Sequence, residues 1–99
     1  MDETLRKFNE VSTKANEAIE NLKYIMKFKG RSFSAFEEFV EEEEHFELAL
    51  HELEEIDKAA DKKDPSKAEM ERVIKEMEER HHYFEKFRKK MYLFAMPQK

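Results

Sequence analysis

Hydrophobic residues recur every three or four positions along most of the chain, which is the spacing of one face of an α-helix. The pattern is interrupted twice, around Gly30 and around Pro65. Glycine often ends a helix because it adopts the left-handed conformation, and the residue before a proline is disfavoured in a helix. The sequence therefore predicts three long helices, at about residues 3–29, 33–62 and 66–96.

The middle helix has the longest apolar face, and the other two helices are expected to pack against it. Its apolar positions are Phe33, Phe36, Phe39, Val40, Phe46, Ala49, Leu50, Leu53, Ile56 and Ala60. Short connections make successive helices antiparallel. The predicted fold class is all-α, an up-down-up antiparallel three-helix bundle formed as a single domain by residues 1–99.

In this topology, all the aromatic side chains except Phe8 fall in or towards one half of the bundle, which we call its aromatic end. They are Tyr24, Phe28, Phe33, Phe36, Phe39, Phe46, Tyr83, Phe84, Phe87, Tyr92 and Phe94. Several of them lie off the main apolar stripes, so one core does not hold them all. An exposed apolar patch usually marks an interaction surface. The residues predicted to form such a binding surface are Tyr24, Phe28, Phe33, Phe36, Val40 and Tyr92.

Three interpretations of this aromatic end stay open at the level of sequence. The extra rings can fold inward over a wide core. The surface can pair with itself in a homodimer. Alternatively, it can receive a helical protein partner or an apolar ligand. Aromatic and methionine side chains are enriched at interfaces, which favours an interacting surface over a purely structural one.

Two charged residues fall on the apolar faces of the predicted helices. Glu42 lies between Phe39 and Phe46 on the second helix, and Arg88 lies on the third. In an antiparallel arrangement the two come out at about the same level. Because an unpaired buried carboxylate is costly, we predict that Glu42 and Arg88 form a buried pair, with Arg80 as the substitute partner.

The spacing Glu-x-x-His occurs twice, at Glu42–His45 and at Glu78–His81. In four-helix carboxylate bundles, two such motifs and two further glutamates hold a di-iron or di-manganese centre. The stretch 41–53 loosely resembles a metal helix of the ferritin type. This resemblance implies a site of Glu42, His45, Glu78 and His81 holding Fe, Mn or Zn. The main prediction has no cofactor, because only three helices are expected and a glutamate-rich chain matches this spacing by chance.

Composition narrows the function classes. Of the 99 residues, 43% are charged, the formal net charge is -5, and there is one glycine and no cysteine. An acidic chain is not typical of nucleic-acid binding, and a phosphate-binding loop needs several glycines. No apolar run approaches the roughly 20 residues of a membrane span, and the first residues lack a secretory apolar segment, so cytoplasmic localisation is expected.

No arrangement of serine, histidine and acid stands out as a nucleophilic site. The sequence thus predicts a non-enzymatic helical module for interaction or self-assembly through its aromatic end, with itself or a helical protein as partner. The alternative is the carboxylate–histidine metal protein. A further alternative is a scaffold without catalytic activity, either thermostable or engineered, because abundant Glu and Lys with little Gly are typical of both.

Overall fold

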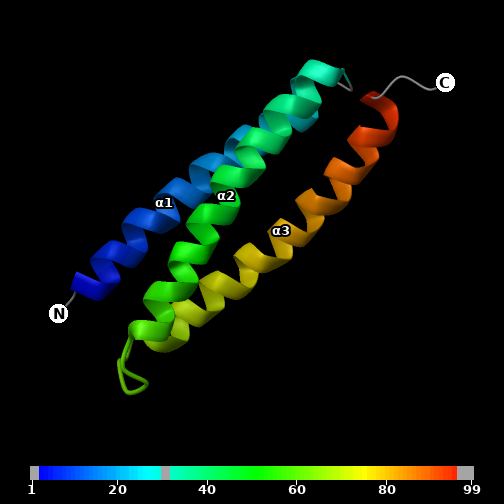
Figure 1. The fold of residues 1–99 in the computed structure, drawn as a ribbon. Coiled ribbons are helices and arrows are strands. Elements are labelled where there is room, and N and C mark those ends of the chain that lie inside the picture. The colour runs from blue at the N-terminus through cyan, green and yellow to red at the C-terminus, as the bar shows by residue number, and fades with distance from the viewer. Residues whose placement is uncertain (1–2, 30–31, 96–99) are drawn as a thin grey trace.

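The computed structural model describes residues 3–29 and 32–95, with side chains as far as Leu93, and confirms the up-down-up three-helix bundle (Figure 1). The helices are α1 (Glu3–Tyr24), α2 (Phe33–Ala59) and α3 (Lys67–Ala95), and α1 continues into one π-helical turn, η1 (Ile25–Lys29). The predictions made at Gly30 and Met96 lie outside the described residues. No helix within the described ranges has an apolar stretch long enough to cross a bilayer.

The turn between α2 and α3 is built from side chains that compete with the helix. Asp61 accepts a hydrogen bond from the backbone N–H of Lys63 at 2.9 Å, which is an Asx turn. This turn explains why α2 ends at Ala59, three residues earlier than predicted. Lys67 at the start of α3 donates to the backbone carbonyl of Asp57, and its Nζ lies 3.2 Å from the Asp57 carboxylate. A cation at a helix C-terminus is favourable, so this contact fixes the two helix ends together.

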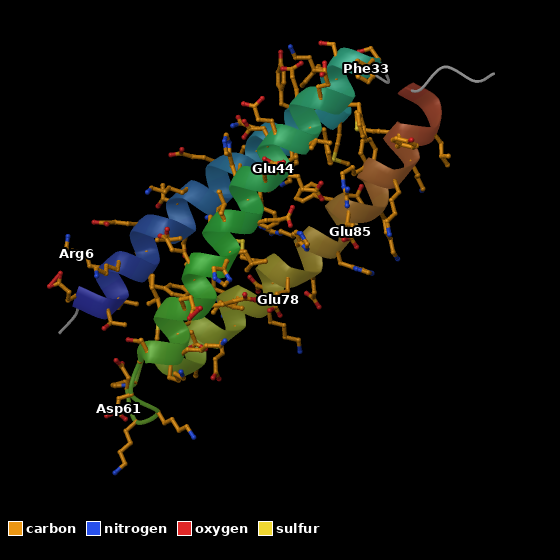
Figure 2. The ribbon with its side chains drawn as sticks, viewed as in Figure 1. Arg6, Phe33, Glu44, Asp61, Glu78 and Glu85 are labelled. Atoms are coloured by element: carbon orange, nitrogen blue, oxygen red, sulfur yellow. The ribbon has the colours of Figure 1, made fainter. Side chains whose placement is uncertain are left out.

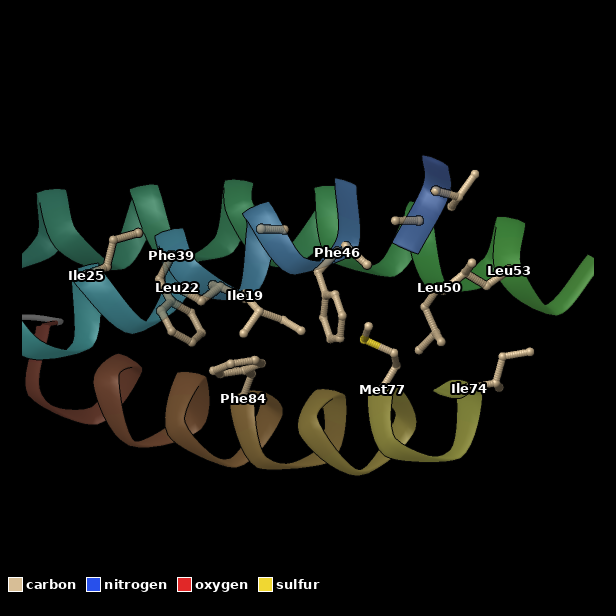
Figure 3. Close-up of a cluster of buried hydrophobic side chains, with 14 of the residues drawn as sticks. Ile19, Leu22, Ile25, Phe39, Phe46, Leu50, Leu53, Ile74, Met77 and Phe84 are labelled. Carbon is tan, nitrogen blue, oxygen red and sulfur yellow. The ribbon is translucent and has the colours of Figure 1, made fainter. Parts of the chain in front are cut away.

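The helices do not pack equally closely. Backbones approach most closely between α1 and α2, less between α2 and α3, and least between α1 and α3 (Figure 1). The buried alanines of α1 and α2 are Ala15, Ala18, Ala35 and Ala49. Small side chains allow helix axes to come close together, whereas larger ones hold them apart. The bulky Met77 and Phe84 of α3 point towards the other two helices (Figure 3), which explains why α3 stands farther off.

The core runs along the inside of all three helices. Its largest fully buried side chains are Ile19, Leu22, Phe39, Phe46, Leu53, Met70 and Met91. Phe46 and Phe84 meet edge to face, with ring centroids 5.9 Å apart, and Phe39 lies 6.2 Å from Phe84 (Figure 3). Aromatic pairs prefer this geometry. The rings predicted for the centre of the apolar stripes are therefore buried together.

Candidate functional site

Phe33 lies at the end of the bundle opposite the turn at Asp61 (Figure 2), and most of the exposed aromatic residues belong to helix segments at this end, whereas Tyr83 lies nearer the middle of α3. The exposed aromatic residues are Tyr24 (54%), Phe28 (64%), Phe33 (48%), Tyr83 (58%) and Tyr92 (50%). Four of the six predicted binding-surface residues, Tyr24, Phe28, Phe33 and Tyr92, are thus at the surface. The remaining two, Phe36 and Val40, are half-buried.

The six predicted residues do not form one continuous surface. Tyr24 contacts Phe28, with ring centroids 5.0 Å apart, and shares a hollow with Glu38 on the side where α1 meets α2. Phe36 contacts Tyr92 at 5.7 Å, on the side where α2 meets α3. Phe36 and Glu38 are about 200° apart around α2, because a helix turns about 100° per residue. The structure therefore divides the predicted surface between two sides of the bundle.

A groove of about 380 Å³ lies between the end of α1, including η1, and the second half of α3. Its inner residues are buried or half-buried apolar side chains, Met26, Phe84 and Phe87, and the exposed ring of Tyr83 adds to this apolar surface. Its edges carry three exposed cations, Lys23, Lys27 and Arg80. We call this feature the α1–α3 groove. It combines an apolar base with a positive rim.

The sequence interpretation missed this groove as a site. It placed Phe84 and Phe87 among the aromatic side chains at one end of the bundle but did not include them in the binding surface. The groove exists because α3 stands away from α1, and that separation depends on how all three helices pack. The available signal was the contrast between the alanines of α1 and α2 and the bulky side chains of α3.

The buried carboxylate on α2 belongs to Glu43, so the predicted pair of Glu42 and Arg88 is wrong by one residue. Glu43 is only 3% exposed, and its Oε1 lies 2.7 Å from Nε of Arg88. Glu42 instead accepts a hydrogen bond from the amide of Asn21 at 3.0 Å, on the side facing α1. The reason is geometric. Positions 42 and 43 both have helical spacing from Phe39 and Phe46, so either could lie on the buried face of α2. In the structure, residue 43 is the one that faces α3.

The pairing of Glu43 is incomplete. The Nε–H of Arg88 is not aligned for a hydrogen bond with Oε1, so the contact is an ion pair, and Oε2 of Glu43 has no hydrogen-bond partner among the described residues. Burial raises the pKa of Glu43 above its ordinary value, although the charge of Arg88 opposes this shift. A buried carboxylate with a free oxygen is costly, and it is often found where a protein has a function to perform.

The four residues of the predicted metal site are not brought together. Glu42 and His45 are neighbours at 3.6 Å on the α1 side of α2. Glu78 on α3 lies beside Glu54 of α2. His81 instead approaches Glu47, with 3.6 Å between Nε2 and the carboxylate. Of the predicted ligands, only His81 takes part in a group of three possible metal ligands within the described part of the chain.

That group consists of Glu43, Glu47 and His81. One possible ligand atom from each residue lies within 4.8 Å of the other two. Glu43 and Glu47 are one helical turn apart on α2, and His81 projects from the facing turn of α3. Glu43 and Glu47 have the i, i+4 spacing typical of one helix face, whereas the two Glu-x-x-His motifs contain other glutamates, Glu42 and Glu78.

The contact between Glu54 and Glu78 gives a testable pH dependence. A hydrogen bond between the two carboxyl groups raises the pKa of Glu78 above its ordinary value of 4.5 in the folded protein. This contribution to stability is therefore fully present below pH 4.5 and is lost as the pH rises through the higher folded pKa. Glu78→Gln should melt at a higher temperature than the parent protein at pH 7, and the difference should shrink towards pH 4.5. Thermal unfolding followed by circular dichroism measures these melting temperatures, and Glu79→Gln at an exposed position is the control. The same change in melting temperature in both variants would contradict the contact between Glu54 and Glu78.

Comparisons of the chain with protein-family models, with curated proteins and with solved structures found no match, so its candidate site rests on the geometry described above.

Proposed function

We propose that the protein is a non-enzymatic interaction module that binds an amphipathic helix of a partner protein in the α1–α3 groove. The observation that carries this proposal is the combination of an apolar base, formed by Met26, Phe84 and Phe87, with three cations along the edges. A helix laid in such a groove places its apolar side chains against the base. It would add a fourth helix beside α1 and α3, the two helices whose backbones approach each other least.

The charge of the groove selects the kind of helix. Lys23, Lys27 and Arg80 are exposed along its edges. Acidic residues flanking the apolar stripe of a partner helix would face these cations, which adds specificity and speeds association. Tyr83, exposed by 58%, offers a large and rigid side chain at the edge, and tyrosine is among the residues that dominate binding energies.

Charge also argues against the same groove of a second copy as the occupant. Two grooves placed face to face would bring three cations against three cations, and like charges across an interface are unfavourable. The outward face of α2 is acidic, with Glu37, Glu41 and Glu44, and its two large exposed apolar side chains, Phe33 and Leu48, stand at opposite ends of this acidic stretch instead of forming a continuous apolar stripe. The partner best suited to the groove is therefore an acidic amphipathic helix from another protein.

The test uses two helical peptides that share a leucine stripe and differ only in their flanking residues, glutamate in one and lysine in the other. Fluorescence anisotropy of the labelled peptides should show binding of the glutamate peptide and weaker binding as salt increases. Tyr83→Glu in the full chain should weaken that binding at least about tenfold, which corresponds to about 1.4 kcal/mol. The substitution removes apolar contact area and places a negative charge against the acidic helix.

The matched control is Leu48→Glu, which adds the same charge at an exposed apolar residue on a different helix. It should leave peptide affinity unchanged. Equal binding of the lysine peptide, or full binding by Tyr83→Glu, would contradict the proposal. Light scattering on the protein alone tests self-association, and a dimer that Tyr83→Glu dissociates would assign the groove to a second copy instead.

A further inference from the structure

We propose that Glu43, Glu47 and His81 form a binding site for a divalent transition-metal ion between α2 and α3. This site is separate from the α1–α3 groove. Of the four ligands of the metal site predicted from the sequence, it shares only His81. It would join the two helices at the centre of the bundle. The argument rests on the geometry of the three side chains, on the free carboxylate oxygen of Glu43 and on the local charge.

The geometry suits a single ion. The three candidate ligand atoms lie within 4.8 Å of one another, so one ion between them would require only small side-chain movements. Two ligands come from adjacent turns of α2 and the third from α3. Three protein ligands leave a fourth position for water, which is a common arrangement for Zn²⁺. Glu47 and His81 reach the surface, with side-chain exposures of 53% and 27%, so an ion has a path into the site.

The second observation is the state of Glu43. Its side chain is almost completely buried, yet Oε2 has no hydrogen-bond partner among the described residues. Burying a carboxylate oxygen without a partner costs free energy. Coordination to a metal ion would satisfy it. Arg88 approaches the other oxygen, Oε1, and so would orient the carboxylate in the way that outer-shell groups hold metal ligands.

The local charge is negative in spite of Arg88. Three carboxylates lie close together, because the charges of Glu47 and Glu85 both act on Glu43. The guanidinium of Arg88 lies 2.7 Å from Glu43 and 3.8 Å from Glu85. Three ionised carboxylates and one guanidinium leave an excess of two negative charges when His81 is a neutral ligand. A divalent cation would balance that excess. An imidazole among the ligands favours Zn²⁺ and its transition-metal neighbours over Mg²⁺ or Ca²⁺, which prefer oxygen ligands alone.

The experiment is a titration of the full chain, freed of metal with a chelator and dialysed, with ZnCl₂ in a calorimeter. We expect one ion per chain and a higher melting temperature with Zn²⁺ than without it, because a ligand that binds the folded state stabilises it. A titration with Co²⁺ should give the visible absorption of a low-coordinate cobalt site. Removing a ligand by Glu47→Gln or by His81→Asn should weaken Zn²⁺ binding at least about tenfold, a loss comparable to that caused by outer-shell changes.

The matched control is His45→Gln, which removes an exposed histidine that also lies next to a glutamate, Glu42, but on the other side of α2. Zn²⁺ affinity should be unchanged in this variant. Circular dichroism confirms that each variant keeps its helix content, and Glu47 is exposed enough for its substitution to be tolerated. The proposal is overturned if Zn²⁺ does not bind, if Glu47→Gln binds it as tightly as the parent chain, or if His45→Gln weakens binding as much as His81→Asn.

Discussion

Phe46→Ala is expected to lower the free energy of unfolding by about 4 kcal/mol. Phe46 is fully buried, its ring lies 5.9 Å from Phe84 and 6.0 Å from His81, and it points from α2 into the core beside Met77 (Figure 3). Alanine would remove the ring and leave a cavity that these neighbours fill only in part. Urea unfolding followed by circular dichroism measures the change.

Leu48→Ala is the control for this prediction. Leu48 lies two residues away on the same helix and is 68% exposed, so its loss should change the free energy of unfolding by no more than about 0.5 kcal/mol. The two substitutions thus report on opposite faces of α2. Similar losses in both variants, or a loss below about 1 kcal/mol for Phe46→Ala, would contradict the placement of Phe46 in the core.

Arg88→Ala is expected to cost about 3 kcal/mol, because it leaves the carboxylate of Glu43 buried without its counter-charge. The double variant Glu43→Leu with Arg88→Met should behave in the opposite way. It replaces the ion pair by apolar side chains of similar size at core-facing positions, and such replacements are often neutral or stabilising by about 1–4 kcal/mol. Urea unfolding in the presence of a chelator separates this effect from metal binding.

The double variant distinguishes two hypotheses about the ion pair, because they predict opposite changes in its free energy of unfolding. If the pair contributes net stability, the double variant should be less stable than the parent. If the pair is tolerated at a cost, the double variant should be at least as stable, and only Arg88→Ala should be weakened. A loss of more than about 1 kcal/mol in the double variant would contradict our expectation.

The fold was predictable from the sequence because periodicity and breakers agree along the whole chain. The error at Glu42 shows that periodicity does not predict which neighbouring helix a buried residue faces. Positions 39, 42 and 46 have helical spacing, and so have positions 39, 43 and 46. α2 contacts both neighbours, so its buried face is wide and both positions lie on it. Which of the two faces α3 depends on how the helices are arranged, and periodicity does not specify this.

The candidate sites were less predictable for a similar reason. The α1–α3 groove depends on the distance between two helices that are not consecutive in the chain, and the Glu43–Glu47–His81 group depends on the rotation of α2 against α3. A helical wheel gives the face of each helix but neither of these quantities. His81 was identified through its Glu-x-x-His spacing, whereas Glu43 and Glu47 belong to neither motif and were not identified.

The close packing of α1 and α2 has a consequence for how the protein opens. α1 and α2 pack closely as a helical hairpin, whereas α3 is joined to them through larger side chains and mainly through α2. Local opening takes place where packing is least dense, in units that often follow such hairpins. Detachment of α3 would leave the α1–α2 hairpin in place, so amide hydrogens of α3 would exchange with solvent before those of α1 and α2. The free energy of this local opening would be lower than the free energy of global unfolding.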